Sequence, residues 1–350
     1  MAAESTADDR VAGPGTRRHR GLLIALGALL FLVLVVVAVT SVTPWPSAML
    51  IRSVFERGGA ATAAEMEKHV PENASLREET DITYADDQTG LTLDMYTTAA
   101  EGEALPTVVW IHGGAWISGS SADVDPYMRI LADAGYTAIA VNYTLGPEAA
   151  YPTAVDELND AFAYIDENAA ELSVDPNTIV IAGDSAGGQL ASQMATLSTN
   201  PDYAELMDLR PALDADQIAG VILNCGVYDL RAMADLNGLV AWGFKISLWS
   251  YTGTKDWSAE SSGSTMATIQ FVTSDFPPTY ISGGNGDGLT WLQSIPMAQR
   301  LKSLDVPVTD VFWPADHVPA LPHEYQFHLD LDEAQEALGH TLEFLESVTS

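Results

Sequence analysis

The chain contains little cysteine and few basic residues. Cys225 is the only cysteine among 350 residues, so no disulfide can form within the chain. There are 15 lysines and arginines against 48 acidic residues, a formal net charge of −33. Phosphate contacts need a basic surface, so we exclude nucleic acid as a partner. The carboxylates are scattered, which is typical of a solvated surface, and they disfavour anionic substrates.

Signatures of cofactor and metal binding are also missing. The glycine-rich turn at 283–288 lacks the G-x-G-x-x-G pattern of a dinucleotide site. His323-Glu324 is followed by a histidine at the fifth residue, whereas H-E-x-x-H needs it at the fourth; on a helix this rotates the two rings about 140° apart. Cys225 ends an apolar run with no activating partner, which predicts a buried thiol. We expect neither a metal nor a cofactor.

One long hydrophobic run stands near the N-terminus. Residues 21–42 carry no charge, and a helix of that length is about 33 Å long, enough to cross a bilayer. Three arginines lie within the four residues before it, so the positive-inside rule predicts a cytoplasmic tail at 1–20 and the bulk of the chain outside. These features indicate a transmembrane signal-anchor helix in a single-pass cell-membrane protein.

A cleaved signal peptide, and hence a secreted protein, is the alternative. The apolar core is longer than the usual 7–15 residues and no A-x-A site follows, so we favour the uncleaved anchor. Residues 43–80 then form a linker or a cap, with Trp45 suited to a membrane interface and apolar residues at helical spacing over 48–55.

The segment Gly183-Asp184-Ser185-Ala186-Gly187-Gly188 fits G-x-S-x-G between a strand-like run at 178–182 and a helix-like stretch. A serine on such a sharp turn projects its hydroxyl clear of the sheet, and neighbours that approach closely must be glycine. Ser185 is therefore the candidate nucleophile.

The upstream segment His112-Gly113-Gly114-Ala115-Trp116 also follows an apolar run, at 108–111. Backbone N–H groups of such a loop can stabilise the oxyanion of acyl transfer. Gly113, Gly114 and the N–H of Ala186 are the candidate oxyanion donors. His112, inside this loop, is interpreted as a structural histidine rather than the catalytic base.

Between these two motifs lie Val141-Asn142-Tyr143-Thr144-Leu145-Gly146-Pro147-Glu148 and Tyr151-Pro152. Over roughly residues 81–346, this order of motifs resembles the α/β-hydrolase esterases related to hormone-sensitive lipase and to bacterial carboxylesterases. The resemblance implies an α/β-hydrolase fold and a chain order of serine, acid and histidine.

The pattern of apolar runs agrees with that fold. Strand-like runs alternate with helical periodicity, which predicts a mostly parallel sheet with helices on both faces. An antiparallel hairpin is expected around 82–84 and 91–96, at the start of a catalytic domain spanning 81–350. The runs lie at 107–111, 137–143, 178–182, 219–225, 278–283 and 308–313.

Two further residues complete the expected triad. Asp287 lies in a glycine-rich turn past the strand at 278–283, where the fold places the acid. His323 precedes the last helix by a short loop, as the base does in the resembling family. His317, closer to the preceding strand, is the alternative base, and His340 a more distant one.

Residues 226–276 are long for a strand connection and rich in aromatics, so they are a possible lid or pocket insertion. We expect a carboxylesterase in which Ser185 attacks a small-molecule ester, His323 moves the proton and water cleaves the acyl-enzyme. An amidase or formamidase, a peptidase, or a polysaccharide acetyl or feruloyl esterase would use the same residues. A catalytically silent hydrolase-fold binding protein is the alternative outside catalysis.

Overall fold

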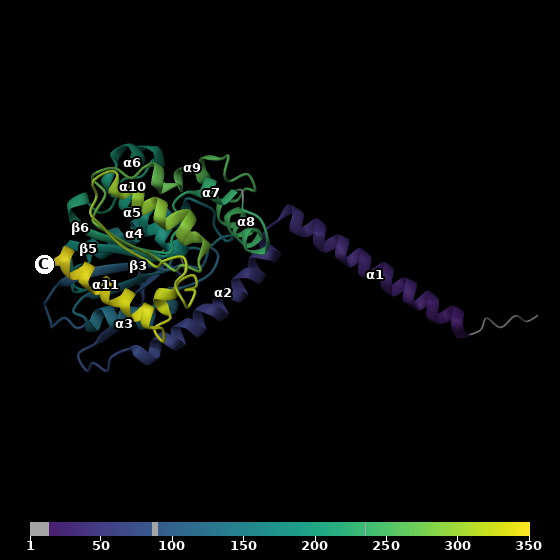
Figure 1. Ribbon diagram of the computed structural model, residues 1–350, viewed down its shortest axis with the longest axis horizontal. Coiled ribbons are helices and arrows are strands. Elements are labelled where there is room, and N and C mark those ends of the chain that lie inside the picture. The colour runs from purple at the N-terminus through teal and green to yellow at the C-terminus, as the bar shows by residue number, and fades with distance from the viewer. Residues whose placement is uncertain (1–13, 86–89, 235) are drawn as a thin grey trace, which may run out of the picture. The chain divides into compact units, whose positions relative to one another are not determined.

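The computed structural model describes residues 14–85, 90–234 and 236–350 (Figure 1). The chain forms two compact units, the second of which is Ala48–Ser350. The first contains α1 (Pro14–Val42), within which Leu22–Val42 is long and apolar enough to cross a membrane. This confirms the expected apolar helix, which would suit a membrane anchor or a signal sequence. Residues 1–13 of the expected tail lie outside the described residues.

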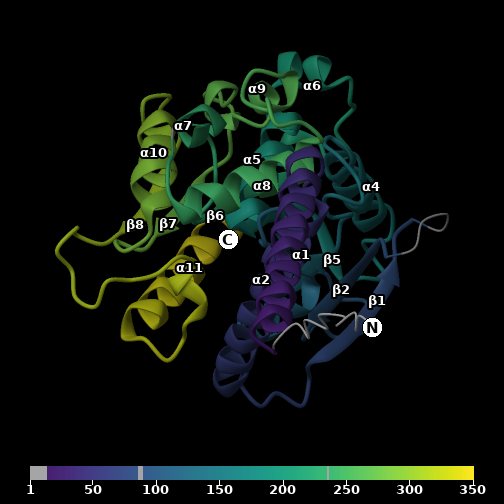
Figure 2. The ribbon, with the colours of Figure 1, turned by 90° about the vertical axis from the view of Figure 1, so that its right-hand side faces the viewer.

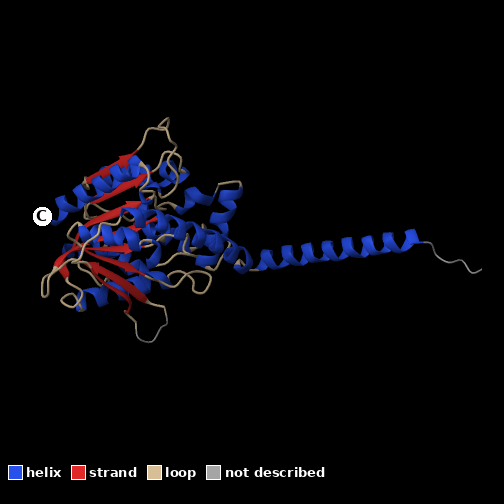
Figure 3. Ribbon diagram, turned by 90° about the horizontal axis from the view of Figure 1, so that it is seen from below, coloured by secondary structure: helices blue, strands red, loops and turns tan. Residues whose placement is uncertain are grey.

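The second unit is built on an eight-stranded sheet in the order β1-β2-β4-β3-β5-β6-β7-β8. Figure 3 shows the strands in red and the helices in blue. The β1–β2 and β2–β4 pairs are antiparallel and the remaining pairs are parallel. This confirms the expected α/β-hydrolase sheet, including its N-terminal hairpin. The strands are β1 (Arg77–Thr83), β2 (Thr92–Thr97), β3 (Leu105–Ile111), β4 (Thr137–Val141), β5 (Val174–Asp184), β6 (Ile218–Asn224), β7 (Thr279–Gly283) and β8 (Val308–Phe312).

Helices cover both faces of the sheet. Because successive side chains of a strand point to opposite faces, Val109 and Val108 belong to two different cores. The core around Val109 is covered by α4 (Thr153–Glu167), α5 (Ser185–Thr199) and α10 (Ile295–Lys302), and that around Val108 by α3 (Asp125–Asp133) and α11 (Asp332–Thr349). Figure 2 shows β7 and β8 between α10 and α11. Burial on both faces explains why the central strands read as continuous apolar runs.

Helices α2 (Trp45–Met66) and α8 (Leu239–Thr252) lie outside the sheet and pack against each other. Helix α2 packs through Ala48 and Ile51 against α8. Arg52 of α2 donates to Glu148 at 2.6 Å and to the carbonyl oxygen of Gly146 at 2.9 Å. From Ala48 onward, α2 therefore belongs to the same compact unit as the sheet. This unit begins before residue 81, where the catalytic domain was expected to begin.

The connection between β6 and β7 holds several short helices, and its aromatic residues divide into two groups. Tyr228, Tyr251 and Trp257 are buried in the core, whereas Trp242 and Phe244 line a pocket. The helices are α7 (Leu230–Ala234), α8, α9 (Ser261–Thr265) and η4 (Thr268–Gln270). The other short helices are η1 (Glu67–His69), η2 (Ser121–Asp123), α6 (Pro201–Met207), η3 (Ala215–Gln217), η5 (Thr290–Ser294) and η6 (Tyr325–Phe327).

Candidate active site

Ser185 stands at the turn between β5, which ends at Asp184, and α5, which it begins. Its φ of 51° lies in the left-handed region that non-glycine residues rarely adopt. The neighbouring backbone leaves no room for a side chain, since a Cβ on Gly187 would lie 1.9 Å from the carbonyl oxygen of Ile111. This is the strained strand-to-helix turn that the G-x-S-x-G pattern predicts.

The imidazole of His323 lies between Ser185 and Asp287. Its Nε2 is 2.9 Å from Ser185 Oγ, and its Nδ1 is 2.7 Å from Asp287 Oδ2. Asp287 also accepts a hydrogen bond from the backbone N–H of Leu289, at 2.9 Å. An acceptor carboxylate at Nδ1 places the ring proton there and leaves Nε2 to accept from the serine hydroxyl. The structure thus brings together the three residues that the sequence selected, from widely separated parts of the chain.

The two loops that carry Asp287 and His323 are tied to each other. Asn285 accepts from the backbone N–H of Leu321 at 2.8 Å, and the N–H of Gly286 donates to the carbonyl oxygen of Leu321 at 2.9 Å. These bonds join residues two positions before His323 to residues one and two positions before Asp287. They fix the distance between acid and imidazole through the backbone.

The alternative histidines have other partners. The Nε2 of His317 is 2.7 Å from Glu333 Oε1, on α11. His340 lies on α11 near Glu336 and Glu343, at 3.8 and 3.0 Å. Neither has an interaction with Ser185 among those of the described residues, so the geometry favours His323 as the base.

The expected oxyanion donors lie around Ser185. Gly113 and Gly114 follow β3 and line the same cavity as Ser185, while Ala186 is in the first turn of α5, where backbone N–H groups have no partner within the helix. Gly114 has a φ of 104°, and a Cβ there would lie 2.1 Å from the carbonyl oxygen of Ser118. Only glycine fits this close approach.

His112 is hydrogen-bonded to the loop that contains Gly113 and Gly114. Its Nδ1 lies 2.8 Å from the carbonyl oxygen of Gly113, and its ring stacks on Tyr143 with centroids 4.6 Å apart. Burial lowers the pKa of His112 to about 4, against a smaller opposing effect of the Gly113 hydrogen bond. The ring is therefore neutral at pH 7, and Nδ1–H donates to Gly113. This contact agrees with the structural role expected of His112.

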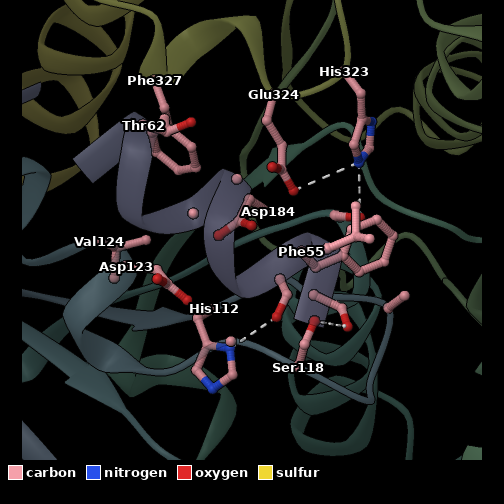
Figure 4. A pocket seen from close by; sticks show the side chains of 18 of the residues that line it. Phe55, Thr62, His112, Ser118, Asp123, Val124, Asp184, His323, Glu324 and Phe327 are labelled. Atoms are coloured by element: carbon pink, nitrogen blue, oxygen red, sulfur yellow. Dashed lines mark hydrogen bonds and ion pairs between the residues drawn. The ribbon is translucent and has the colours of Figure 1, made fainter. Parts of the chain in front are cut away.

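Ser185 lines a cavity of about 340 Å³, which Figure 4 shows from close by. Phe55 and Thr62 of α2 line it, and in Figure 4 Phe55 lies close to His323 and Thr62 close to Phe327. Three side chains with carboxyl groups, Asp123, Asp184 and Glu324, line it, and none of its described lining residues is a lysine or an arginine. Such a lining disfavours anionic substrates.

Asp184 and Glu324 were not among the expected site residues, yet they meet beside the triad. Asp184 is buried and accepts from Trp110 Nε1 at 2.8 Å. Burial, then the charge of Glu324, holds the pKa of Asp184 well above its usual range. The more buried carboxyl keeps the proton, so Asp184 donates to Glu324, with which it is hydrogen-bonded.

Glu324 also lies close to His323. Its Oε1 is 3.5 Å from Nε2 of His323, the nitrogen that faces Ser185. Burial alone would lower the pKa of His323, but the charge of Glu324, the hydrogen bond with Asp287 and the nearby Cys225 together raise it well above its usual range. Glu324 has a φ of 57°, a conformation the sequence does not reveal. Its place directly after His323 was the only available signal.

A second, larger pocket of about 710 Å³ adjoins the first and shares five lining residues with it. Its walls come from α2, from α8 and from η5, and they are mainly apolar. The shared residues are Val54, Phe55, Ala115, Phe244 and His323. An apolar group bound next to Ser185 can therefore extend between α2 and α8.

Cys225 is buried, as expected, and lies close to Asp287 and His323. The possible ligand atoms of the three residues lie within 4.8 Å of one another, an arrangement that could hold a metal ion. Asp287 and His323 are already hydrogen-bonded to each other at 2.7 Å, so a metal here would replace the contact that orients the imidazole. Burial raises the pKa of the Cys225 thiol, which disfavours the thiolate that zinc prefers.

Comparisons with known proteins agree with this architecture. A family model described as BD-FAE matches residues 93–301, more than half of the chain. The carboxylesterase NlhH of Mycobacterium tuberculosis is 39% identical over 122 residues, which are 35% of this chain and 38% of that protein. A putative alpha/beta hydrolase, R526 of Acanthamoeba polyphaga mimivirus, is 35% identical over 117 residues, 32% of this chain and 34% of that protein. The chain thus matches little more than a third of the length of these relatives.

Solved structures match over most of the chain. Esterase B from Lactobacillus rhamnosis has a TM-score of 0.72 at 23% identity, covering 87% of this chain and 96% of that one. An esterase from Pyrobaculum calidifontis has a TM-score of 0.67 at 22% identity, covering 86% of this chain and 93% of that one. At these identities the likeness shows the shared fold.

Proposed function

Because the chain belongs to the BD-FAE family and has the α/β-hydrolase fold, we propose that it is a carboxylesterase that acts through an acyl-enzyme. Ser185 is its nucleophile, His323 its base and Asp287 its acid. The observation that carries the proposal is the alignment of these three side chains, with His323 at 2.9 Å from Ser185 Oγ and at 2.7 Å from Asp287.

The chemistry follows from this alignment. Ser185 Oγ attacks the ester carbonyl carbon while its proton passes to His323 Nε2, and Asp287 stabilises the imidazolium that forms. The carbonyl oxygen becomes an oxyanion, which accepts from the N–H groups of Gly113, Gly114 and Ala186. Collapse of the tetrahedral intermediate expels the alcohol, which takes the proton from Nε2. Water, deprotonated by His323, then cleaves the acyl-enzyme and frees Ser185.

A covalent probe tests the nucleophile. A fluorophosphonate should label the full chain in detergent, and Ser185→Ala should abolish labelling. A wild-type chain that hydrolyses no ester and takes no label would contradict the proposal and favour a silent binding protein.

The assignment of the base is tested separately. His323→Ala should lower kcat/KM for a short-chain ester by several orders of magnitude, because a neutral serine hydroxyl is a poor nucleophile without its base. His317→Ala, which removes a ring paired with Glu333 instead, should cost far less. The reverse result would transfer the role to His317.

We also propose the placement of the chain. Leu22–Val42 remains attached as a single-pass anchor, with the tail at 1–20 inside the cell and the catalytic unit outside. Residues 43–80 and 226–276 supply caps over the pocket, since Phe55 and Phe244 both line it. Protease added to intact cells should cleave the catalytic unit, and the mature chain should keep its full mass; loss of the first residues and release into the medium would indicate a signal peptide.

A further inference from the structure

The exposed apolar side chains of the second unit are concentrated at one place. Ten large apolar side chains are exposed among its described residues, and seven of them line the larger pocket. We call these seven the apolar rim: Leu50, Val54, Phe55, Leu239, Val240, Trp242 and Leu292. An eighth, Trp291, is adjacent to the rim in sequence. Such a concentration marks an interaction surface, whereas single exposed apolar residues do not.

The two segments that carry most of the apolar rim contain no acidic residue. There are 48 acidic residues in the chain, yet residues 45–55, which begin α2, and 236–255, which contain α8, include none. Three basic residues lie in these two segments: Arg52, Lys245 and Lys255. A strongly acidic protein is repelled by anionic lipid headgroups, so the surface formed by these two segments, on which Arg52 is paired with Glu148, is the part best able to approach a bilayer.

The chain itself keeps the rim close to the proposed membrane. Leu50 follows Val42, the last residue of the apolar span, by eight residues. Even fully extended, eight residues reach no more than about 28 Å. The rim on α2 is therefore tethered near the bilayer surface, whatever the orientation of the catalytic unit.

From these three observations we propose that the apolar rim docks into the surface of the lipid bilayer and admits ester substrates directly from it. The proposal rests on the catalytic function and the membrane anchor proposed above. The larger pocket is bounded by the rim and shares His323 with the cavity that holds Ser185. An ester whose long apolar chain is dissolved in the bilayer can thus present its carbonyl to the nucleophile while the chain stays in an apolar environment. The substrate class is accordingly a membrane-partitioned, amphiphilic ester.

Spin labels can test the docking without reference to catalysis. Nitroxides are attached to Leu239→Cys and Val240→Cys, whose native side chains are 81% and 74% exposed. Leu206→Cys and Val318→Cys, 55% and 84% exposed, are matched controls outside the rim. The background is clean because Cys225 is fully buried, and labelling of the unsubstituted chain verifies this.

The full chain is reconstituted into phosphatidylcholine nanodiscs, and collision of each nitroxide with oxygen and with a water-soluble nickel chelate is measured. Oxygen concentrates in hydrocarbon and the chelate in water. Labels at 239 and 240 should show an oxygen-to-chelate ratio several-fold higher than labels at 206 and 318. Equal ratios at all four positions would overturn the proposal. Shielding of the rim labels from both reagents, with dipolar broadening that disappears on dilution with unlabelled chain, would show that a second copy covers the rim instead.

Activity supplies the second readout. Leu239→Asp with Val240→Asp should lower hydrolysis of a long-chain ester embedded in vesicles several-fold more than hydrolysis of a soluble short-chain ester. The matched change Leu206→Asp should leave the ratio of the two activities unchanged. Equal loss on both esters would refute entry from the bilayer while leaving the esterase proposal intact. No hydrolysis of either ester by the wild type would instead contradict the esterase proposal.

Discussion

Acid should destabilise this fold through His112, and the size of the effect follows from its burial. The pKa of His112 is about 4 in the folded chain and about 6.5 in an exposed histidine. As pH falls below 6.5, His112 becomes protonated in the unfolded chain, whereas in the folded chain it stays neutral until the pH approaches 4. The folded-state pKa is depressed, so the free energy of unfolding falls with pH across this window.

The magnitude can be worked out for two accessible pH values. Between pH 7 and pH 5 the linkage removes about 2 kcal/mol, and below pH 4 the loss levels off at about 3.4 kcal/mol. His112→Asn is the matched variant, because its amide N–H can replace the Nδ1–H donation to Gly113 and does not titrate. The variant should cost stability at pH 7 through lost stacking on Tyr143, and this cost should shrink or reverse at pH 5.

Urea denaturation at both pH values measures the difference between the wild type and His112→Asn. The comparison cancels all other titrating groups, since they are common to both chains. If the difference in unfolding free energy is the same at pH 7 and pH 5, His112 is not held neutral by burial and the reasoning fails. A larger cost at pH 5 would refute the sign of the linkage.

Three further perturbations test other parts of the site. Glu324→Gln should shift the low-pH fall of kcat/KM to lower pH, because it removes a charge that raises the pKa of His323. The control Glu333→Gln, which changes the partner of His317, should leave this part of the pH profile unchanged. An unchanged profile in both variants would show that Glu324 does not raise the pKa of His323. Gly187→Ala should destabilise the fold by at least about 3 kcal/mol in thermal or chemical unfolding, whereas Gly288→Ala, whose Cβ meets nothing within 4 Å, should be tolerated. Chelation by EDTA should leave turnover unchanged and added zinc should inhibit reversibly, since zinc would compete for the acid and base; activation by zinc would contradict this.

The strands of the sheet and the turn around Ser185 could be predicted from sequence, because each depends on residues that are close together in the chain. Strands buried on both faces give continuous apolar runs, and the turn around Ser185 demands glycine at 183 and 187 within a few residues of chain. The resemblance to a known family then ordered the acid and the base. The observed strands β3–β8 fall within a few residues of the expected runs.

The remaining features depend on tertiary contact, which the sequence does not encode locally. Glu324 has a left-handed backbone conformation and lies 3.5 Å from His323 Nε2, and neither feature is visible in the sequence. Asp184 meets Glu324 across the cavity although 140 positions separate them in the chain. Helix α2 joins the catalytic unit because Ala48 and Ile51 pack on α8, so a segment with the periodicity of a simple amphipathic helix forms a wall of the pocket.

The spacing of the reacting groups has a consequence for biosynthesis. Ser185 and His323 are 138 residues apart, and the loop that carries the imidazole is tied to the turn after β7. A growing polypeptide therefore has no competent nucleophile until at least 138 residues beyond Ser185 have been synthesised and β7 has joined its neighbours. If the chain is exported before it folds, its hydrolytic activity would first appear on the far side of the membrane. Esters in the cytoplasm would then not be hydrolysed, and no separate inhibitor would be needed.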